Sequence, residues 1–125
     1  MLKIVLTISC EGNVRTAVKD NIISKFTYMA FGSGTFSGLS TGTALGAEVI
    51  TVARQEYTDL SNSVIISGFL NAAQGNTNIL KEVGCREAST GTFQSGKNIK
   101  AVSKTSSKEL WVDEEVGLTI SQEEL

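Results

Sequence analysis

The sequence predicts a mainly β protein: a single-domain antiparallel β-sandwich or barrel-like fold with one short N-terminal α-helix at about residues 13–24. Short β-branched and aromatic segments recur along the chain, and turn-forming residues separate them about every 8–12 residues. A helical spacing of apolar residues occurs near the N-terminus. A length of 125 residues suits one hydrophobic core, so residues 1–125 are predicted to form one domain.

The helix follows a change of period. Residues 2–9 alternate apolar and other residues, which predicts a strand that Glu11-Gly12-Asn13 interrupts. Asn13 is expected to cap the helix, because its side chain can accept a hydrogen bond from the first free backbone N–H groups. The apolar positions then recur at i, i+3, i+4 and i+8: Val14, Ala17, Val18 and Ile22.

Strands and turns account for most of the remaining chain. Residues 48–57 and 63–71 are predicted to pair, and Val64-Ile65-Ile66 is β-branched on both faces, as in a strand buried on both sides. Residues 32–46 and 87–96 are predicted to be loops, and residues 73–78 a turn with Gly75-Asn76 at its tip. Further strands are expected at residues 26–31, 79–85, 98–104, 109–113 and 116–121.

The composition excludes most common catalytic sites. The chain has no histidine, so it can form neither an imidazole-based triad nor a His-ligated zinc or haem site. Two cysteines are too few for a structural zinc site or an iron–sulfur cluster. Cys10 and Cys85 are predicted to be free, packed thiols, with a single disulfide as the alternative. No catalytic, cofactor-binding or metal-ligating residues are predicted.

The charge distribution argues against nucleic acid and membrane as partners. The net charge of −2 does not favour wholesale binding to nucleic acid, and no apolar run approaches the ~20 residues of a membrane span. Residues 113–125 contain five acidic residues and no base, which indicates a solvated acidic C-terminal end. The N-terminal stretch has no convincing signal-peptide cleavage site, so synthesis in a cytoplasm is expected.

Two glycine-rich segments partly match nucleotide-binding motifs. Residues 91–98 match G-x-x-x-x-G-K, but Asn98 replaces the Ser or Thr that would hold magnesium, and a strand pattern follows in place of a helix. Residues 32–38 have one residue too many for a dinucleotide fingerprint. A hairpin loop with a basic tip and a polar loop are the preferred interpretations.

The remaining charged residues show no catalytic pattern. The carboxylates that could form a glycosidase pair lack a pairing signal and are predicted to be solvated or salt-bridged: Glu48, Glu56, Glu82 and Glu87. Four lysines are spaced three, four and four residues apart, but they lie in a predicted strand and lack the interleaved aromatics that stack bases: Lys97, Lys100, Lys104 and Lys108. Trp111 is predicted to lie in the core, with an oligomer interface as the alternative.

Several short motifs lie in a characteristic order along the chain. Gly32-Ser33-Gly34 follows an aromatic strand, Thr43-Ala44-Leu45-Gly46-Ala47-Glu48 precedes Arg54, and Glu82-Val83-Gly84 comes about thirty residues later. This succession resembles bacteriophage tail-fibre, tail-collar and baseplate proteins over about residues 12–120. Glu48 and Arg54 are farther apart than the family's Glu and Arg, which leaves an ion pair between them open.

The resemblance implies a non-enzymatic virion component of a tail, baseplate or fibre, assembled in the host cytoplasm. Such proteins are usually homo-oligomers that contact other virion proteins through β-rich surfaces. A head-decoration or head-fibre protein is a related alternative. Another is a small β-sandwich binding module for carbohydrate or a host surface, with Tyr28, Tyr57 and Trp111 as the available aromatics.

Overall fold

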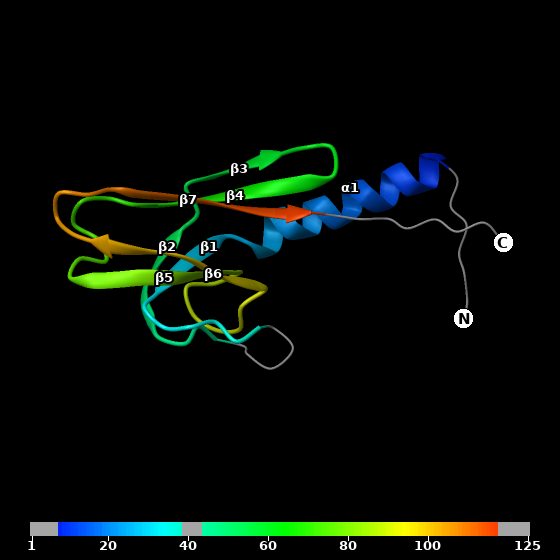
Figure 1. The fold of residues 1–125 in the computed structure, drawn as a ribbon. Helices are drawn as coiled ribbons and strands as arrows, with labels where there is room; N and C mark the ends of the chain where they lie inside the picture. Colours follow the sequence, from blue (N-terminus) through cyan, green and yellow to red (C-terminus); the bar gives the residue numbers. More distant parts are fainter. Residues whose placement is uncertain (1–7, 39–43, 118–125) are drawn as a thin grey trace.

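Two antiparallel sheets and one helix make up the computed structural model, which describes residues 8–38 and 44–117, with side chains from residue 13 onward. The first sheet has the order β2-β1-β5-β6 and the second β3-β4-β7 (Figure 1). The elements are α1 (Ile8–Lys25), β1 (Tyr28–Gly32), β2 (Glu48–Ala53), β3 (Glu56–Asp59), β4 (Ser63–Leu70), β5 (Asn78–Arg86), β6 (Ser95–Lys104) and β7 (Leu110–Gly117). The mainly β prediction is confirmed, and the two separate sheets form a sandwich.

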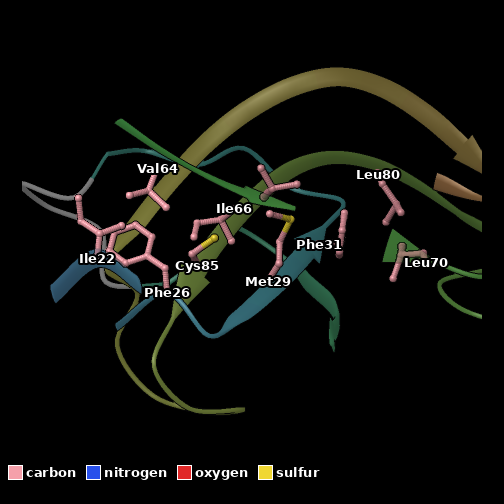
Figure 2. Close-up of a cluster of buried hydrophobic side chains, with 10 residues drawn as sticks. Ile22, Phe26, Met29, Phe31, Val64, Ile66, Leu70, Leu80 and Cys85 are labelled. Atoms are coloured by element: carbon pink, nitrogen blue, oxygen red, sulfur yellow. The ribbon is translucent and has the colours of Figure 1, made fainter. Parts of the chain in front are cut away.

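The two sheets enclose one main core. β1 and β5 from one sheet and β4 from the other supply most of it, and Ile22 of α1 and the following Phe26 close one end (Figure 2). The sheets approach closely at Gly68, where an added Cβ would lie 2.3 Å from the sulfur of Met29. The buried members are Ile22, Phe26, Met29, Phe31, Val64, Ile66, Leu70, Leu80, Val83 and Cys85.

A second, smaller cluster covers the outer face of the first sheet. It consists of Ala30 on β1, Phe36 and Leu45 from the segment between β1 and β2, and Phe93 from the segment between β5 and β6. β1 is therefore buried on both faces, since its alternate residues Met29 and Phe31 face the main core. The loops predicted from the Gly, Ser and Thr content thus also serve as a cover for the sheet.

The helix is confirmed, but it begins at Ile8, earlier than predicted. Asn13 lies inside the helix and is not its cap, and Glu11-Gly12-Asn13 does not interrupt it. One glycine inside a helix costs only about 1 kcal/mol, which the rest of the helix can offset. The strand predicted over residues 2–9 is wrong for residues 8 and 9, and residues 1–7 lie outside the described part.

The C-terminal half of α1 packs on the sandwich, and the helix extends beyond it (Figure 1). Ile22 is buried, whereas Val14 and Val18 are exposed. Arg54 Nη1 donates to the backbone oxygens of Ile23 and Phe26 and so holds the end of the helix. The Nζ of Lys19 bonds to Asp59 at 2.9 Å and ties the middle of the helix to β3.

Two strand predictions differ from the structure. Residues 48–57 form two strands in different sheets, β2 and β3, because the chain crosses between sheets at Arg54 and Gln55; the N–H of Arg54 bonds to Thr27 and that of Gln55 to Ser67. The predicted pairing with residues 63–71 holds only for β3. The strands predicted at residues 109–113 and 116–121 are, as far as described, one strand, β7, which begins at Leu110, because the alternation continues through Glu114.

Candidate functional site

A groove of about 810 Å³ lies between β6 and β7, the end strands of the two sheets. One wall comes from residues 96–100 of β6 and the other from residues 112–117 of β7, with Val83 of β5 between them. An end strand leaves one row of backbone N–H and C=O groups unpaired, so both walls present groups that another strand can pair with. This groove is the best-formed candidate for an interaction site.

The sandwich is open on this side and closed on the other. At the opposite edge, the chain passes directly from β2 to β3 through two residues, whose backbone N–H groups bond to each sheet. β6 and β7 are joined only by a turn at one end, where the N–H of Lys108 bonds to the oxygen of Thr105. The groove therefore results from the topology and not from a missing side chain.

The groove has a mixed interior and charged rims. Val83 is buried and Ile99 and Val112 are half-buried, but Lys97, which pairs with Val83 across β5 and β6, lies on the same face as Val83. Lys100 of β6 and Asp113 and Glu115 of β7 are exposed. An occupant must therefore offer apolar side chains to the groove and tolerate charges of both signs.

Glu114 is the unusual residue of the groove because it points inward on an apolar strand face. It pairs with Ile66 across β4 and β7, and its Oε2 accepts a hydrogen bond from the Sγ of Cys85 at 3.0 Å. Burial raises the pKa of the Cys85 thiol well above its usual range, and the neighbouring Glu114 carboxylate raises it further. Cys85 is a free, buried thiol, as predicted, and the side chain of Cys10 lies outside the described part.

Glu82 overturns the prediction of a solvated or salt-bridged carboxylate. It is fully buried, and its oxygens accept three backbone hydrogen bonds, from Gly34 at 3.2 Å, Gly46 at 2.9 Å and Ala47 at 2.8 Å. Gly32 must be glycine here, because an added Cβ would lie 2.3 Å from Glu82 Oε1. Glu82 thus fixes both ends of the segment between β1 and β2.

The other three carboxylates of the proposed set do not converge on Glu82. Glu48 forms an ion pair with Arg86 at 3.0 Å, and Glu87 pairs with Lys25 at 3.1 Å. Glu56 lies exposed on β3. The described structure therefore does not bring this set together as an acid–base pair.

The G-x-x-x-x-G-K segment has structural contacts that explain its residues. Gly91 has a positive φ of 106°, and Gly96 lies under the ring of Phe36, where an added Cβ would approach its Cζ to 2.4 Å. The Oδ1 of Asn98 accepts from the Phe36 N–H at 2.8 Å, and its Nδ2 donates to the Phe36 oxygen at 2.9 Å. The segment leads into β6 and not into a helix.

The four lysines do not form one patch. Lys97 and Lys100 are exposed on β6, but Lys104 is fully buried. The Nζ of Lys104 bonds to the Asn76 side chain at 2.9 Å and to the Thr105 oxygen at 3.1 Å, so it ties the turn after β4 to the turn after β6. Lys108 lies in that second turn.

Trp111 is 48% exposed, so the prediction that it lies in the core is wrong. It packs on Phe69 with ring centroids 6.1 Å apart, and its Nε1 donates to Asp113 at 2.7 Å. Tyr57 is 45% exposed, but its partner across β3 and β4 is the inward-facing Ile66, whereas Trp111 faces outward beside Phe69. The two aromatics therefore lie on opposite faces of the sheet and do not share a platform.

Arg54 and Arg86 have roles that differ from those suggested by spacing alone. Glu48 pairs with Arg86 and not with Arg54, and Arg86 also donates to Thr51 and stacks over the Phe93 ring. Arg54 holds the end of α1 and lies over the Tyr57 ring at 4.7 Å. Both guanidinium groups therefore join segments that are distant in sequence.

Sequence reasoning missed Asn98 and Glu114, which line the groove. The signal for Asn98 was its departure from the nucleotide-binding motif, and that for Glu114 was a charge within the alternation of Val112 and Val116. Both positions break an otherwise regular pattern, and in each case the side chain has a specific partner. A break in the sequence pattern is therefore the signal that could have indicated these two residues.

The described part of the chain contains no group of three Cys, Asp or Glu side chains placed to hold a metal ion. Within residues 8–38 and 44–117, no helix is both long and apolar enough to cross a bilayer. No protein-family model matches the chain, and no curated protein matches it.

Proposed function

We propose that the protein is a non-enzymatic structural component of a tailed virus, in the tail, baseplate or fibre, and that it acts by assembling with further copies of itself and with other virion proteins. The observation that carries this proposal is the convergence of the motifs on which the resemblance to tail-fibre, tail-collar and baseplate proteins rests. Gly34, Gly46 and Glu82 belong to three separate motifs, and they meet at one buried carboxylate.

This convergence supports the resemblance because it gives the motif order a physical reason. A buried carboxylate needs several hydrogen-bond donors, and backbone N–H groups can reach it only where no side chain intervenes. Glycines at positions 32, 34 and 46 meet that requirement. A sequence that keeps these motifs in this order keeps the fold of the loop, and the exposed α1 and open groove offer surfaces for assembly.

The proposal is tested on purified virus particles. The chain is expected as a stoichiometric component by mass spectrometry and at a defined position by electron microscopy with a labelled antibody. Its absence from particles that are otherwise complete would overturn the virion proposal. In solution, light scattering coupled to size-exclusion chromatography is expected to give an oligomer.

A second candidate function is a carbohydrate- or host-binding module, and the exposed Trp111 beside Phe69 favours it. Aromatic rings on a sheet surface stack on the apolar faces of sugars. Binding on a glycan array that is lost in Trp111→Ala and kept in Tyr57→Ala would support this function, since only Trp111 lies beside Phe69. An array without hits would count against it.

A further inference from the structure

We propose that residues 2–7 of a second copy bind as an additional β-strand in the groove between β6 and β7. This inference rests on the proposed assembly function and names its interface. The open groove, the alternating pattern of residues 2–7 and the position of α1 carry it independently of one another.

The groove has the dimensions and the backbone groups that an extended segment requires. Its β7 wall runs over residues 112–117, which at about 3.4 Å per residue is close to 20 Å. Residues 2–7 as a strand span the same length. Main-chain pairing along an open sheet edge supplies affinity in such complexes, and alternate side chains supply specificity.

The side chains of the segment match the groove. Leu2, Ile4 and Leu6 fall on one side of a strand, and the groove interior offers Val83, Ile99 and Val112. This arrangement places apolar side chains on the apolar part of the groove, between Lys97 and Glu114.

On the other side of the segment, Lys3 would face outward, where Asp113 and Glu115 are exposed on β7. Opposite charges on neighbouring strands of one face attract each other.

The position of α1 favours a second copy as the source of the segment. Lys19 is tied to Asp59 of β3, and Ile8 lies eleven residues earlier, which corresponds to about 17 Å along a helix axis. Residues 2–7 extend at most about 20 Å, so returning to their own sandwich would use most of their length and leave too little to lie along the groove. In a neighbouring copy they can occupy the full groove.

The exposure of α1 also favours a second copy as the binding partner. Val14 is 40% and Val18 36% exposed, and the helix carries residues of low helix propensity such as Gly12 and Thr16. Isolated helices of this length are marginal in water, and most helical stability in proteins comes from packing. A neighbouring sandwich that holds residues 2–7 would also cover this part of the helix.

Glu114 lowers the affinity of the interface. Strand insertion would remove water from a carboxylate whose described partner is the Cys85 thiol, which weakens the binding of any apolar segment, residues 2–7 included. The substitution Glu114→Gln removes the charge and keeps the shape. It is therefore expected to strengthen association about tenfold.

The test compares Ile4→Asn with Val5→Asn in the full chain. The two variants replace neighbouring β-branched residues with the same polar residue, but only Ile4 would face the groove. Native mass spectrometry and light scattering over a concentration series are expected to show association weakened at least tenfold in Ile4→Asn and nearly unchanged in Val5→Asn. Hydrogen exchange at residues 96–100 and 112–117 should be slow in the wild-type oligomer and fast in Ile4→Asn.

A charge exchange covers the case in which Ile4→Asn does not fold. Glu115→Lys should weaken association, and Lys3→Glu added to it should restore association. Equal association by Ile4→Asn and Val5→Asn, no exchange protection at the groove, or no tightening by Glu114→Gln would overturn the proposal. An oligomer that persists with an open groove would refute this interface alone, whereas a monomer at every concentration would refute assembly itself.

Discussion

At the scale of single residues, polar side chains hold the loops to the sandwich. Glu82 binds both ends of the segment between β1 and β2, and Asn98 binds Phe36 in the same segment. Lys104 joins two turns in a similar way. Glu82 and Lys104 are fully buried, so removal of either side chain leaves its hydrogen-bond partners unpaired.

The clearest residue-scale prediction concerns Glu82. Glu82→Gln places an amide N–H₂ where a carboxylate oxygen accepts backbone N–H groups, so it is expected to lower the free energy of unfolding by about 2–3 kcal/mol. Glu87→Gln is the matched control, because Glu87 is exposed and pairs only with the surface residue Lys25; its expected change is within about 0.5 kcal/mol. Urea denaturation of both variants measures the difference. Equal stability of the two would contradict the role given to Glu82.

Cys85 gives a pH-dependent prediction. Burial, reinforced by Glu114, holds its pKa above the ordinary value near ~8.5, so the folded thiol stays protonated while the unfolded thiol ionises. The stability that this thiol contributes is complete below about pH 8 and declines as the pH rises, by about 2 kcal/mol at pH 10. The difference in unfolding free energy between wild type and Cys85→Ala should therefore shrink from pH 8 to pH 10. A constant difference would show that the thiol ionises alike in both states.

The raised pKa of Cys85 also predicts that its thiol reacts slowly in the folded protein. In a Cys10→Ser background, alkylation of Cys85 at pH 8 should be at least about a hundredfold slower in the folded protein than in urea, because the thiolate is the reactive form. A mass-spectrometric time course measures both rates. Similar rates would place the thiol in contact with solvent.

At the scale of the elements, short-range patterns predicted the type of each element better than its ends. The helix, and strands close to β1, β4 and β5, follow from periodicity and β-branched content. The division between β2 and β3 does not, because Arg54 and Gln55 cross between sheets through hydrogen bonds to residues distant in sequence. The groove depends on which strands lie at the sheet ends, and only the topology supplies that.

Gly96 provides a test of the element packing. Its Cα lies under the Phe36 ring, so Gly96→Ala is expected to displace the ring and destabilise the protein by about 1–3 kcal/mol. Gly117→Ala is the control, because an added Cβ there meets no atom of the described residues within 4 Å. Thermal denaturation of both variants checks the prediction, and an unchanged midpoint for Gly96→Ala would contradict the packing of Phe36 on β6.

At the scale of the whole molecule, one core joins all parts. Side chains of both sheets and of α1 meet in the main cluster (Figure 2). β1 links that cluster to the smaller one on its other face. The sequence indicated one core through chain length and spacing. It could not indicate that one side of the sandwich stays open, since this depends on the crossing from β2 to β3 at the opposite side.

A shared core predicts cooperative unfolding. The fluorescence of Trp111, which reports on the sheet that contains β7, and far-UV circular dichroism, which reports on all elements, should give coincident transitions in urea. The experiment is carried out at a fixed protein concentration, because association shifts apparent stability. Two separated transitions would divide the chain into independently folding parts.

The angle at which α1 leaves the sandwich has a geometric consequence for any assembly built through residues 2–7. Phe26 in the core, the Arg54 contacts to the helix end and the Lys19–Asp59 ion pair fix that angle. Residues 2–7 of one copy and the groove of the next are different surfaces, so each contact relates neighbouring copies by the same rotation and translation. A rotation that divides the full circle closes a ring, and any other builds a helical filament, so these few contacts at the base of α1 set the symmetry.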